Sequence, residues 1–380
     1  MATDSANKAA ARAGSVARGW RDSFAVEVSG LGSMHFQSTV RPTSDEQSRL
    51  RFKISHPSRK NKNAARVGHP AVYSTSRMIR IFGTVFAGLL GLAFGSFLNV
   101  CLSRWPAGES IVRPRSHCRS CNRTLAWWEN VPLVSWLALR GRCRSCRAWI
   151  GWRYPLVELA VGVLWAVQAW RFLSLALDPE LYTHHLPLRD IYEAFGVMVG
   201  NMILYWLLVA LAYLDAENLW LSNSITLPGT ALGFAWISLA PALQKLDPSY
   251  YTKITTALQI ETIVIGELIS ILTAAGLILL IRWLYWLIRR REGIGLGDAK
   301  LMAMLAAWLG LPGALLAFGL GVVLGALVAV VLLAIPAARA QSGSWALKKL
   351  PLGTFLCAGG IVSSLWGQPI IAAYLRWAGF

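Results

Sequence analysis

The sequence has little charge. Only 15% of its 380 residues are Asp, Glu, Lys or Arg, whereas 55% are hydrophobic. Acidic residues are the scarcest, with 19 Asp and Glu against 37 Lys and Arg. This composition excludes an ordinary soluble domain and indicates a multi-span membrane protein. The positive-inside rule explains the basic excess, and no basic-aromatic RNA-binding module is visible. We therefore expect membrane lipid, and no nucleic acid, among the partners.

The sequence also has no apolar core near Met1, so we do not expect a cleavable signal peptide. Residues 1–77 are polar and carry thirteen Lys and Arg against five acids. They are predicted to form a disordered extension. The first strongly hydrophobic segment begins at Met78, which is an alternative start of translation. Residues 78–103 are predicted to be the first transmembrane helix.

Hydrophobic segments recur along the rest of the chain and predict an all-α polytopic membrane protein with about eight transmembrane helices. Two of the segments, 227–243 and 299–310, are short or interrupted by Gly and Pro. Residues 154–380 are predicted to form one membrane domain. The predicted spans are Ile79–Leu102, 154–174, 191–214, 227–243, 260–288, 299–310, 312–335 and 354–376.

A polar insert, residues 104–153, separates the first two predicted spans. It contains ten Arg but only two acidic residues, Glu109 and Glu129. The positive-inside rule therefore predicts that the insert is cytoplasmic. Alternation of the later spans then places Asp215, at the end of the third span, on the cytoplasmic side. Asp298, at the start of the sixth span, falls on the same side.

Cysteine is also rare, and four of the six cysteines lie in this insert as two C-x-x-C motifs. The motifs Cys118-Arg-Ser-Cys121 and Cys143-Arg-Ser-Cys146 are separated by 21 residues, close to the spacing of a zinc ribbon. Four thiolates can complete a tetrahedral zinc site, and such a closed site is structural. A cytoplasmic location argues against disulfides. A redox pair and an iron–sulfur site are the alternatives.

Two aspartates are the candidate catalytic residues. Asp215 directly follows an apolar span, and Asp298 follows Gly295 and Gly297, which would allow a substrate backbone to approach closely. Either carboxylate alone could simply occupy a helix terminus. Two carboxylates held close together share a proton, so one can activate water while the other protonates a scissile carbonyl. The pair predicts an aspartic protease at a membrane surface. Glu158, inside an apolar span, is a candidate for binding or helix pairing.

Several motifs occur in a specific order between about residues 90 and 360, and on them the chain resembles the bifunctional prepilin peptidases, or type IV leader peptidases. The resemblance implies that Asp215 and Asp298 are the catalytic pair and that Gly295, Gly297 and Lys300 support them. Glu217 is a further supporting candidate within its motif. The motifs are Gly95-Ser-Phe-Leu-Asn-Val100, the four cysteines, Arg153-Tyr-Pro-Leu-Val-Glu158, Leu214-Asp-Ala-Glu217, Gly295-Leu-Gly-Asp-Ala-Lys300 and Leu350-Pro-Leu-Gly353.

The resemblance also implies an activity and a location. Such enzymes cleave the leader peptide of type IV prepilins and pseudopilins at the cytoplasmic face of the bacterial inner membrane. They then methylate the new N-terminal residue with S-adenosylmethionine, although no glycine-rich loop here identifies a binding site for that cofactor. The chain departs from the family at Leu221-Ser222-Asn223, where Leu-Pro-Asp is frequent, and at Leu352, where an aromatic residue is common.

Two alternatives to the bifunctional enzyme remain open. One is a peptidase without methyltransferase activity, in which the cysteine insert is only structural. The other is a membrane scaffold or transporter without enzymatic activity. The residues indicate neither the oligomeric state nor the particular prepilin.

Overall fold

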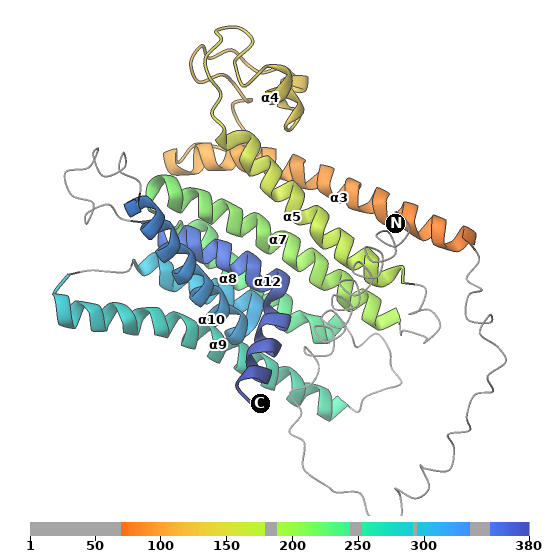
Figure 1. The fold of residues 1–380 in the computed structure, drawn as a ribbon, viewed down its shortest axis with the longest axis vertical. Coiled ribbons are helices and arrows are strands. Elements are labelled where there is room, and N and C mark those ends of the chain that lie inside the picture. The colour runs from red at the N-terminus through yellow and green to blue at the C-terminus, as the bar shows by residue number, and fades with distance from the viewer. Residues whose placement is uncertain (1–69, 179–187, 244–252, 292–294, 335–349, 380) are drawn as a thin grey trace, which may run out of the picture.

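The computed structural model describes residues 70–178, 188–243, 253–291, 295–334 and 350–379 (Figure 1). The described residues are mainly helical, and the only β-structure among them is two isolated bridges in the insert. The predicted all-α class is therefore confirmed. The long helices are α3 (Pro70–Arg104), α5 (Arg153–Ala176), α7 (Leu188–Asn218), α8 (Asn223–Leu243), α9 (Lys253–Arg289), α10 (Leu296–Ala334) and α12 (Leu352–Trp377).

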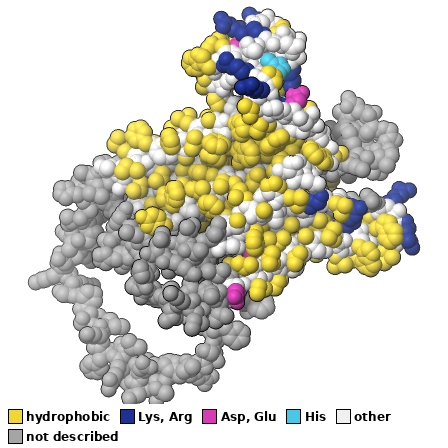
Figure 2. Space-filling view, turned by 180° about the vertical axis from the view of Figure 1, so that it is seen from behind, with side chains coloured by type: hydrophobic (Ala, Val, Ile, Leu, Met, Phe, Trp, Pro, Cys, Tyr) yellow, Lys and Arg dark blue, Asp and Glu magenta, His cyan; other side chains and the backbone are white. Residues whose placement is uncertain are grey.

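In the described part of the chain, six helical segments are long and apolar enough to cross a membrane. Their outer faces expose large hydrophobic side chains such as Phe82 and Phe86, and Figure 2 shows hydrophobic side chains over much of the helix bundle. An aqueous protein would bury such a surface, so this is a multi-pass membrane protein. The segments are Thr75–Ala107, Arg153–Ala176, Asp190–Asn218, Glu261–Arg289, Leu296–Leu332 and Leu352–Trp377.

The described residues contain six candidate membrane spans, two fewer than the eight predicted, for two reasons. The predicted span 227–243 lies in α8, which is not among the six. The predicted spans 299–310 and 312–335 are joined in α10, whose helical geometry breaks at Gly310 (φ 67°, ψ 174°), two residues before Pro312. Glycine adopts this positive φ without strain, and proline cannot continue the preceding hydrogen-bond ladder.

Contacts between α10 and α12 show that α10 reverses direction at this break. In the first half, Leu305 packs against Gly360. In the second half, a Cβ on Gly321 would lie 3.1 Å from Leu356, and one on Gly325 would lie 3.2 Å from Phe355. The start of α10 lies near the start of α12, because a Cβ on Gly297 and one on Gly353 would each lie 3.0 Å from Leu221. The contacts therefore ascend α12 before Gly310 and descend it afterwards. The break coincides with the predicted boundary between two spans, and the count of eight spans stays a prediction.

Helices α3 and α5 form a close antiparallel pair at the edge of the bundle. A Cβ on Gly91 would lie only 2.9 Å from the Cα of Gly162, so small residues allow the two backbones to approach. Helix α3 begins at Pro70, inside the segment predicted to be disordered, so the first helix is longer than its hydrophobic stretch. Residues 1–69 lie outside the described part of the chain.

The insert between α3 and α5 forms a small lobe beside one end of the bundle (Figure 1). Its short helices are η3 (Trp105–Ala107), η4 (Trp127–Asn130) and α4 (Val134–Ala138). Lys and Arg side chains gather on the lobe, in contrast to the hydrophobic surface of the bundle (Figure 2). The surface of the lobe thus differs in charge from that of the bundle, and the domain boundaries stay a prediction.

Candidate active site and metal centre

The end of α7 and the starts of α8, α10 and α12 meet at one end of the bundle. The side chain of Leu221, between α7 and α8, lies 3.0 Å from where a Cβ would stand on Gly297 and 3.0 Å from where one would stand on Gly353. Lys300 Nζ donates a 2.6 Å hydrogen bond to Asn223 Oδ1. Gly297 therefore makes room for Leu221 of the same chain, and Lys300 ties α10 to α8.

Asp215 lies in the last turn of α7 and is 6% exposed. Its Oδ2 accepts hydrogen bonds from the backbone N–H of Thr354 (2.7 Å) and from Thr354 Oγ1 (3.2 Å). A Cβ on Gly353 would lie 2.9 Å from the same oxygen, so only glycine permits this approach. Helix termini leave such N–H groups without intrahelical partners. The Asp215 carboxylate therefore caps the N-terminus of α12.

Asp298 lies in the first turn of α10 and is 8% exposed. Its Oδ2 accepts a 3.2 Å hydrogen bond from the backbone N–H of Gly295, an arrangement typical of a residue that caps its own helix. The Asp215 and Asp298 carboxyl groups are close enough to interact electrostatically, and the buried thiol of Cys357 interacts with both. The two aspartates, far apart in the sequence, are thus neighbours in the fold.

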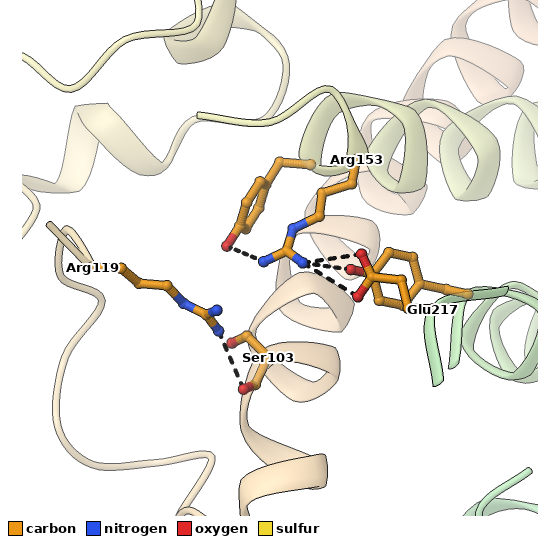
Figure 3. Close-up of polar contacts among 6 residues, drawn as sticks. Ser103, Arg119, Arg153 and Glu217 are labelled. Carbon is orange, nitrogen blue, oxygen red and sulfur yellow. Dashed lines mark hydrogen bonds and ion pairs between the residues drawn. The ribbon is translucent and has the colours of Figure 1, made fainter. Parts of the chain in front are cut away.

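Glu217 lies in the last turn of α7, two residues after Asp215. It is paired with an arginine and not with the aspartates. Arg153 Nη1 donates to Glu217 Oε1 (3.2 Å) and Oε2 (3.3 Å), and also to the Tyr213 hydroxyl (2.7 Å) (Figure 3). Arg153 Nη2 donates to the Tyr154 hydroxyl at 3.1 Å. The Glu217 side chain remains 44% exposed. This cluster joins the start of α5 to the end of α7.

Glu158 is buried where the insert meets the bundle. Its Oε2 accepts a 2.8 Å hydrogen bond from the backbone N–H of Leu133 in the insert, and the Ser96 and Asn99 side chains of α3 also bind it. Leu133 itself has a positive φ of 57°, which is unusual for a residue other than glycine. Glu158 thus contacts both α3 and the lobe, and its predicted role in binding or helix pairing stays a prediction.

Arginines of the lobe strengthen this attachment to α3. Arg119 Nη2 donates to the backbone carbonyl of Ser103 at 3.3 Å (Figure 3). Arg104, the last residue of α3, donates to the carbonyls of Ser110 (2.8 Å) and Pro114 (2.6 Å). Part of the insert's positive charge is therefore used to fix its own loops at the end of the first helix.

The four cysteines of the insert converge. All four Sγ atoms lie within 4.8 Å of one another, and those of Cys118 and Cys146 are 3.7 Å apart. None of them forms a disulfide. A tetrahedron with Zn–S bonds of about 2.3 Å has sulfur–sulfur edges of about 3.8 Å, so the cluster fits a four-thiolate metal site. The backbone N–H groups of Cys146 and Ser145 lower the pKa of the Cys143 thiol to about 6. Against a backbone hydrogen bond from Ala148, burial and the neighbouring thiols raise the pKa of Cys146 to about 11, so the metal-free cluster favours the thiolate at Cys143 over that at Cys146.

The two C-x-x-C motifs fold alike. Cys118 N–H donates to the Arg123 carbonyl (2.9 Å), and Cys143 N–H donates to the Ala148 carbonyl (2.8 Å). The residue after each second cysteine, Asn122 or Arg147, has positive φ (54° and 58°). Each motif is therefore a local knuckle, and two knuckles face each other to form the cluster.

Comparison with known proteins identifies both halves of the chain. Residues 89–172 match the family model of the bacterial peptidase A24 N-terminal domain, and residues 202–330 match that of the type IV leader peptidase family. The prepilin leader peptidase/N-methyltransferase of Stutzerimonas stutzeri is 33% identical over 76% of this chain and 93% of that protein. The chain belongs to the type IV leader peptidase family. Its resemblance to that family, stated from the motifs, is confirmed.

Two further members of the type IV leader peptidase family carry the same name, prepilin leader peptidase/N-methyltransferase. The protein of Pseudomonas aeruginosa is 33% identical over 77% of this chain and 93% of its own length. That of Myxococcus xanthus is 38% identical over 59% of this chain and 56% of its own length. No solved structure was found to match the chain.

The two family matches divide along the structure. The N-terminal match covers the C-terminal part of α3 from residue 89, the cysteine lobe and most of α5, whereas the leader peptidase match begins in α7 and ends in α10. Both aspartates lie in the second region and all four cysteines in the first. Thr354, which donates hydrogen bonds to Asp215, lies outside both matched regions. Sequence reasoning missed Thr354, although it directly follows the Leu350–Gly353 motif, and it missed Tyr213, which accepts from Arg153.

Proposed function

We propose that this protein is a membrane aspartic endopeptidase that removes the leader peptide of type IV prepilins and pseudopilins and then N-methylates the new N-terminal residue. The site would face the cytoplasm at the bacterial inner membrane. Membership of the type IV leader peptidase family supports cleavage, and the names of the relatives combine cleavage with methylation. The basic lobe lies at the end of the bundle where Arg153 joins Glu217, which supports a cytoplasmic position for that end.

The observation that carries the proposal is the meeting of Asp215 and Asp298, two buried and electrostatically interacting carboxyl groups. Such a pair retains one proton between its members. The ionised carboxylate would accept a proton from water as the water attacks the scissile carbonyl. The protonated partner would donate its proton to the carbonyl oxygen.

The position of the pair suits a prepilin substrate. The aspartates lie at the ends of apolar helices, so a substrate with its own apolar helix in the bilayer would present its leader junction at that level. Among the described residues, a Cβ on Gly295 would meet only Asp298 Oδ2, at 3.4 Å, and the backbone of Gly297. The space that the described residues leave beside Gly295 supports the approach of an extended peptide to Asp298.

The experiment that tests the proteolytic proposal is processing of a prepilin by membranes containing Asp215→Asn or Asp298→Asn. Both variants should leave the prepilin uncleaved, because an amide can neither ionise nor share the proton. Asp190→Asn, at the opposite end of α7 from Asp215, is the matched control and should cleave normally. Full processing by either active-site variant would eliminate the aspartyl mechanism and favour a non-enzymatic membrane protein.

Methylation is tested on the same cleaved product. S-adenosylmethionine would supply the methyl group when bound, and a labelled methyl donor should therefore transfer label to the new N-terminus. Product that is cleaved but unlabelled would limit the protein to the peptidase reaction.

The cysteine lobe is proposed to hold one structural zinc ion per chain. Cys118, Cys121, Cys143 and Cys146 would be its four ligands, and their convergence supports this assignment. A closed four-thiolate site leaves no position for a substrate, so zinc would stabilise the lobe and take no part in cleavage. Metal analysis should find about one zinc per chain and none in Cys118→Ser. A folded wild-type protein without metal would contradict the assignment.

A further inference from the structure

The two aspartates have unequal hydrogen-bond environments. Asp215 Oδ2 accepts from Thr354 N–H (2.7 Å) and Thr354 Oγ1 (3.2 Å), and the backbone N–H of Gly353 also binds this carboxylate. Among the described residues, Asp298 Oδ2 accepts a hydrogen bond from the N–H of Gly295, at 3.2 Å. Donors that converge on a carboxylate favour its ionised form over its protonated form. The difference therefore distinguishes two residues that are chemically identical.

The donors on Asp215 come from the first turn of α12. The first N–H groups of a helix carry the positive end of its dipole, and they cannot turn away or accept a proton. Asp298 also lies in a first turn, but of its own helix, and its hydrogen bond from the described Gly295 is longer than that from Thr354 N–H to Asp215. The fixed field of α12 is thus directed at Asp215.

The hydroxyl of Thr354 adds an adjustable donor to the fixed ones. Its Oγ1 lies 3.0 Å from the carbonyl of Ala212 and 3.2 Å from Asp215 Oδ2, yet a hydroxyl has one proton to donate. When Asp215 is ionised, donation to the carboxylate is favoured because a hydrogen bond to a charged acceptor is the stronger one. Thr354 can therefore respond to the charge on Asp215.

The other charged groups near Asp215 are engaged elsewhere. Arg153 of α5 is paired with Glu217, and Lys300 of α10 is bonded to Asn223. Helix α8 carries no charged residue between Asn223 and Leu243. Among the described residues, Asp298 and the thiol of Cys357 are the titratable groups that interact with Asp215. The donors of α12 therefore provide the principal stabilisation of a charge on Asp215.

We propose that Thr354 is a positioning residue that keeps Asp215 as the ionised general base and leaves the shared proton on Asp298. The proposal rests on the proposed peptidase function. In the attack step, the water oxygen bonds to the carbonyl carbon and Asp215 takes the water proton. Asp298 transfers its own proton to the carbonyl oxygen, so the pair still holds one proton afterwards.

The test is the pH dependence of prepilin cleavage by variants at position 354. Thr354→Val keeps the backbone N–H and the shape but removes the hydroxyl, whereas Thr354→Ser keeps both donors. Thr354→Pro removes both, and the first helical turn tolerates proline. Thr230→Val is the matched control, because its hydroxyl bonds only to the Thr226 carbonyl of α8. The rates are measured with the full-length enzyme in membranes.

The two limbs of the profile report different members of the pair. If Asp215 is the ionised member in the active form, loss of a donor moves the acidic limb alone, since the first ionisation then becomes harder. We expect Thr354→Val to move that limb upward by about one pH unit, from the strength of a hydrogen bond to a charged group. Thr354→Pro should move it further, and Thr354→Ser and Thr230→Val should retain the wild-type profile.

Movement of the alkaline limb alone would reverse the assignment and make Asp298 the base. An unchanged profile in Thr354→Val and Thr354→Pro would refute a role for α12, even though both aspartates remained essential. Cleavage by Asp215→Asn would instead refute the peptidase proposal itself, so the two failures are distinguishable. If Thr354→Val does not accumulate in membranes, Thr354→Ala provides the same comparison without a bulky side chain.

Discussion

The cysteine lobe and the helix bundle bring their functional groups together in different ways. In the lobe, each knuckle is closed by hydrogen bonds between residues a few positions apart, such as that from Cys118 to Arg123. In the bundle, Asp215 and Thr354 come from helices far apart in the sequence, and their contact depends on the packing of whole helices. The lobe is thus locally encoded, whereas the site in the bundle is a product of the complete fold.

The same contrast applies to what stabilises each region. The bundle buries a continuous apolar core that includes Leu208, Leu305 and Leu356. Few side chains of the lobe are buried, Cys143 among them, and its exposed residues include Trp127 and Trp149. A region without its own core commonly requires a metal or disulfide. Metal should therefore matter greatly to the lobe and little to the bundle.

The largest expected effect separates catalysis from metal binding. Asp298→Asn should reduce prepilin cleavage by about 10²–10⁴-fold, the range for loss of a general acid or base. Zinc content and helical circular dichroism should remain those of the wild type. Among the described residues, the polar partners of Asp298 are Gly295, Asp215 and Cys357, which lie outside the lobe. Metal loss in this variant would show that the two regions are coupled.

Loss of the metal should disturb the lobe and leave the helix bundle intact. Cys143→Ser removes one of the four proposed ligands, and structural zinc binding in isolated peptides is worth about 10–16 kcal/mol. Amide exchange should then accelerate across the lobe, from about Arg115 to Ile150, while α7 and α10 keep their protection. Cys101→Ala, a buried thiol outside the cluster, is the control and should retain the metal. Unchanged exchange in the lobe would mean that its hydrogen bonds suffice without metal.

These regions also differ in how far the sequence predicts them. Cysteine spacing predicted the four-cysteine cluster because the knuckles depend on residues close in sequence. Hydropathy and charge placed Asp215 and Asp298 at one end because both follow from counting spans. Gly310 and Pro312 marked the reversal in α10, since their backbone chemistry interrupts a helix wherever they occur.

What the sequence did not predict depends on contacts between distant helices. The donation from Thr354 to Asp215 requires α12 to begin beside the end of α7, and no local pattern specifies that register. The bond from Lys300 to Asn223 is of the same kind, although Lys300 lies in a recognised motif and Asn223 at a stated departure from the family pattern. Gly297 was predicted to make room for a substrate, and its nearest neighbour in the structure is Leu221.

A smaller effect is expected where the two regions join. Glu158→Ala would leave the N–H of Leu133 without its acceptor, which costs about 1–3 kcal/mol when the group stays buried. The result should be faster amide exchange at Leu133 and its neighbours, with zinc retained. Glu158→Gln keeps an acceptor and should have a weaker effect. The control is Glu267→Gln, a carboxyl in α9 far from the lobe in sequence; equal exchange in the Glu158 and Glu267 variants would remove Glu158 from the junction.

The smallest effect is expected at the exposed ion pair between Arg153 and Glu217. Glu217→Gln should lower stability by less than about 1 kcal/mol, because solvent screens a pair whose carboxylate is 44% exposed. Arg153 also retains the hydroxyls of Tyr213 and Tyr154 as acceptors, so its position should persist. The cleavage rate of Glu217→Gln is compared with that of Arg153→Lys. The comparison distinguishes a role of Glu217 in stability from a direct contact of Glu217 with the substrate. A large loss of cleavage in Glu217→Gln at unchanged stability would place its carboxylate in the leader-binding site, because a basic leader is the partner that would use its exposed oxygens.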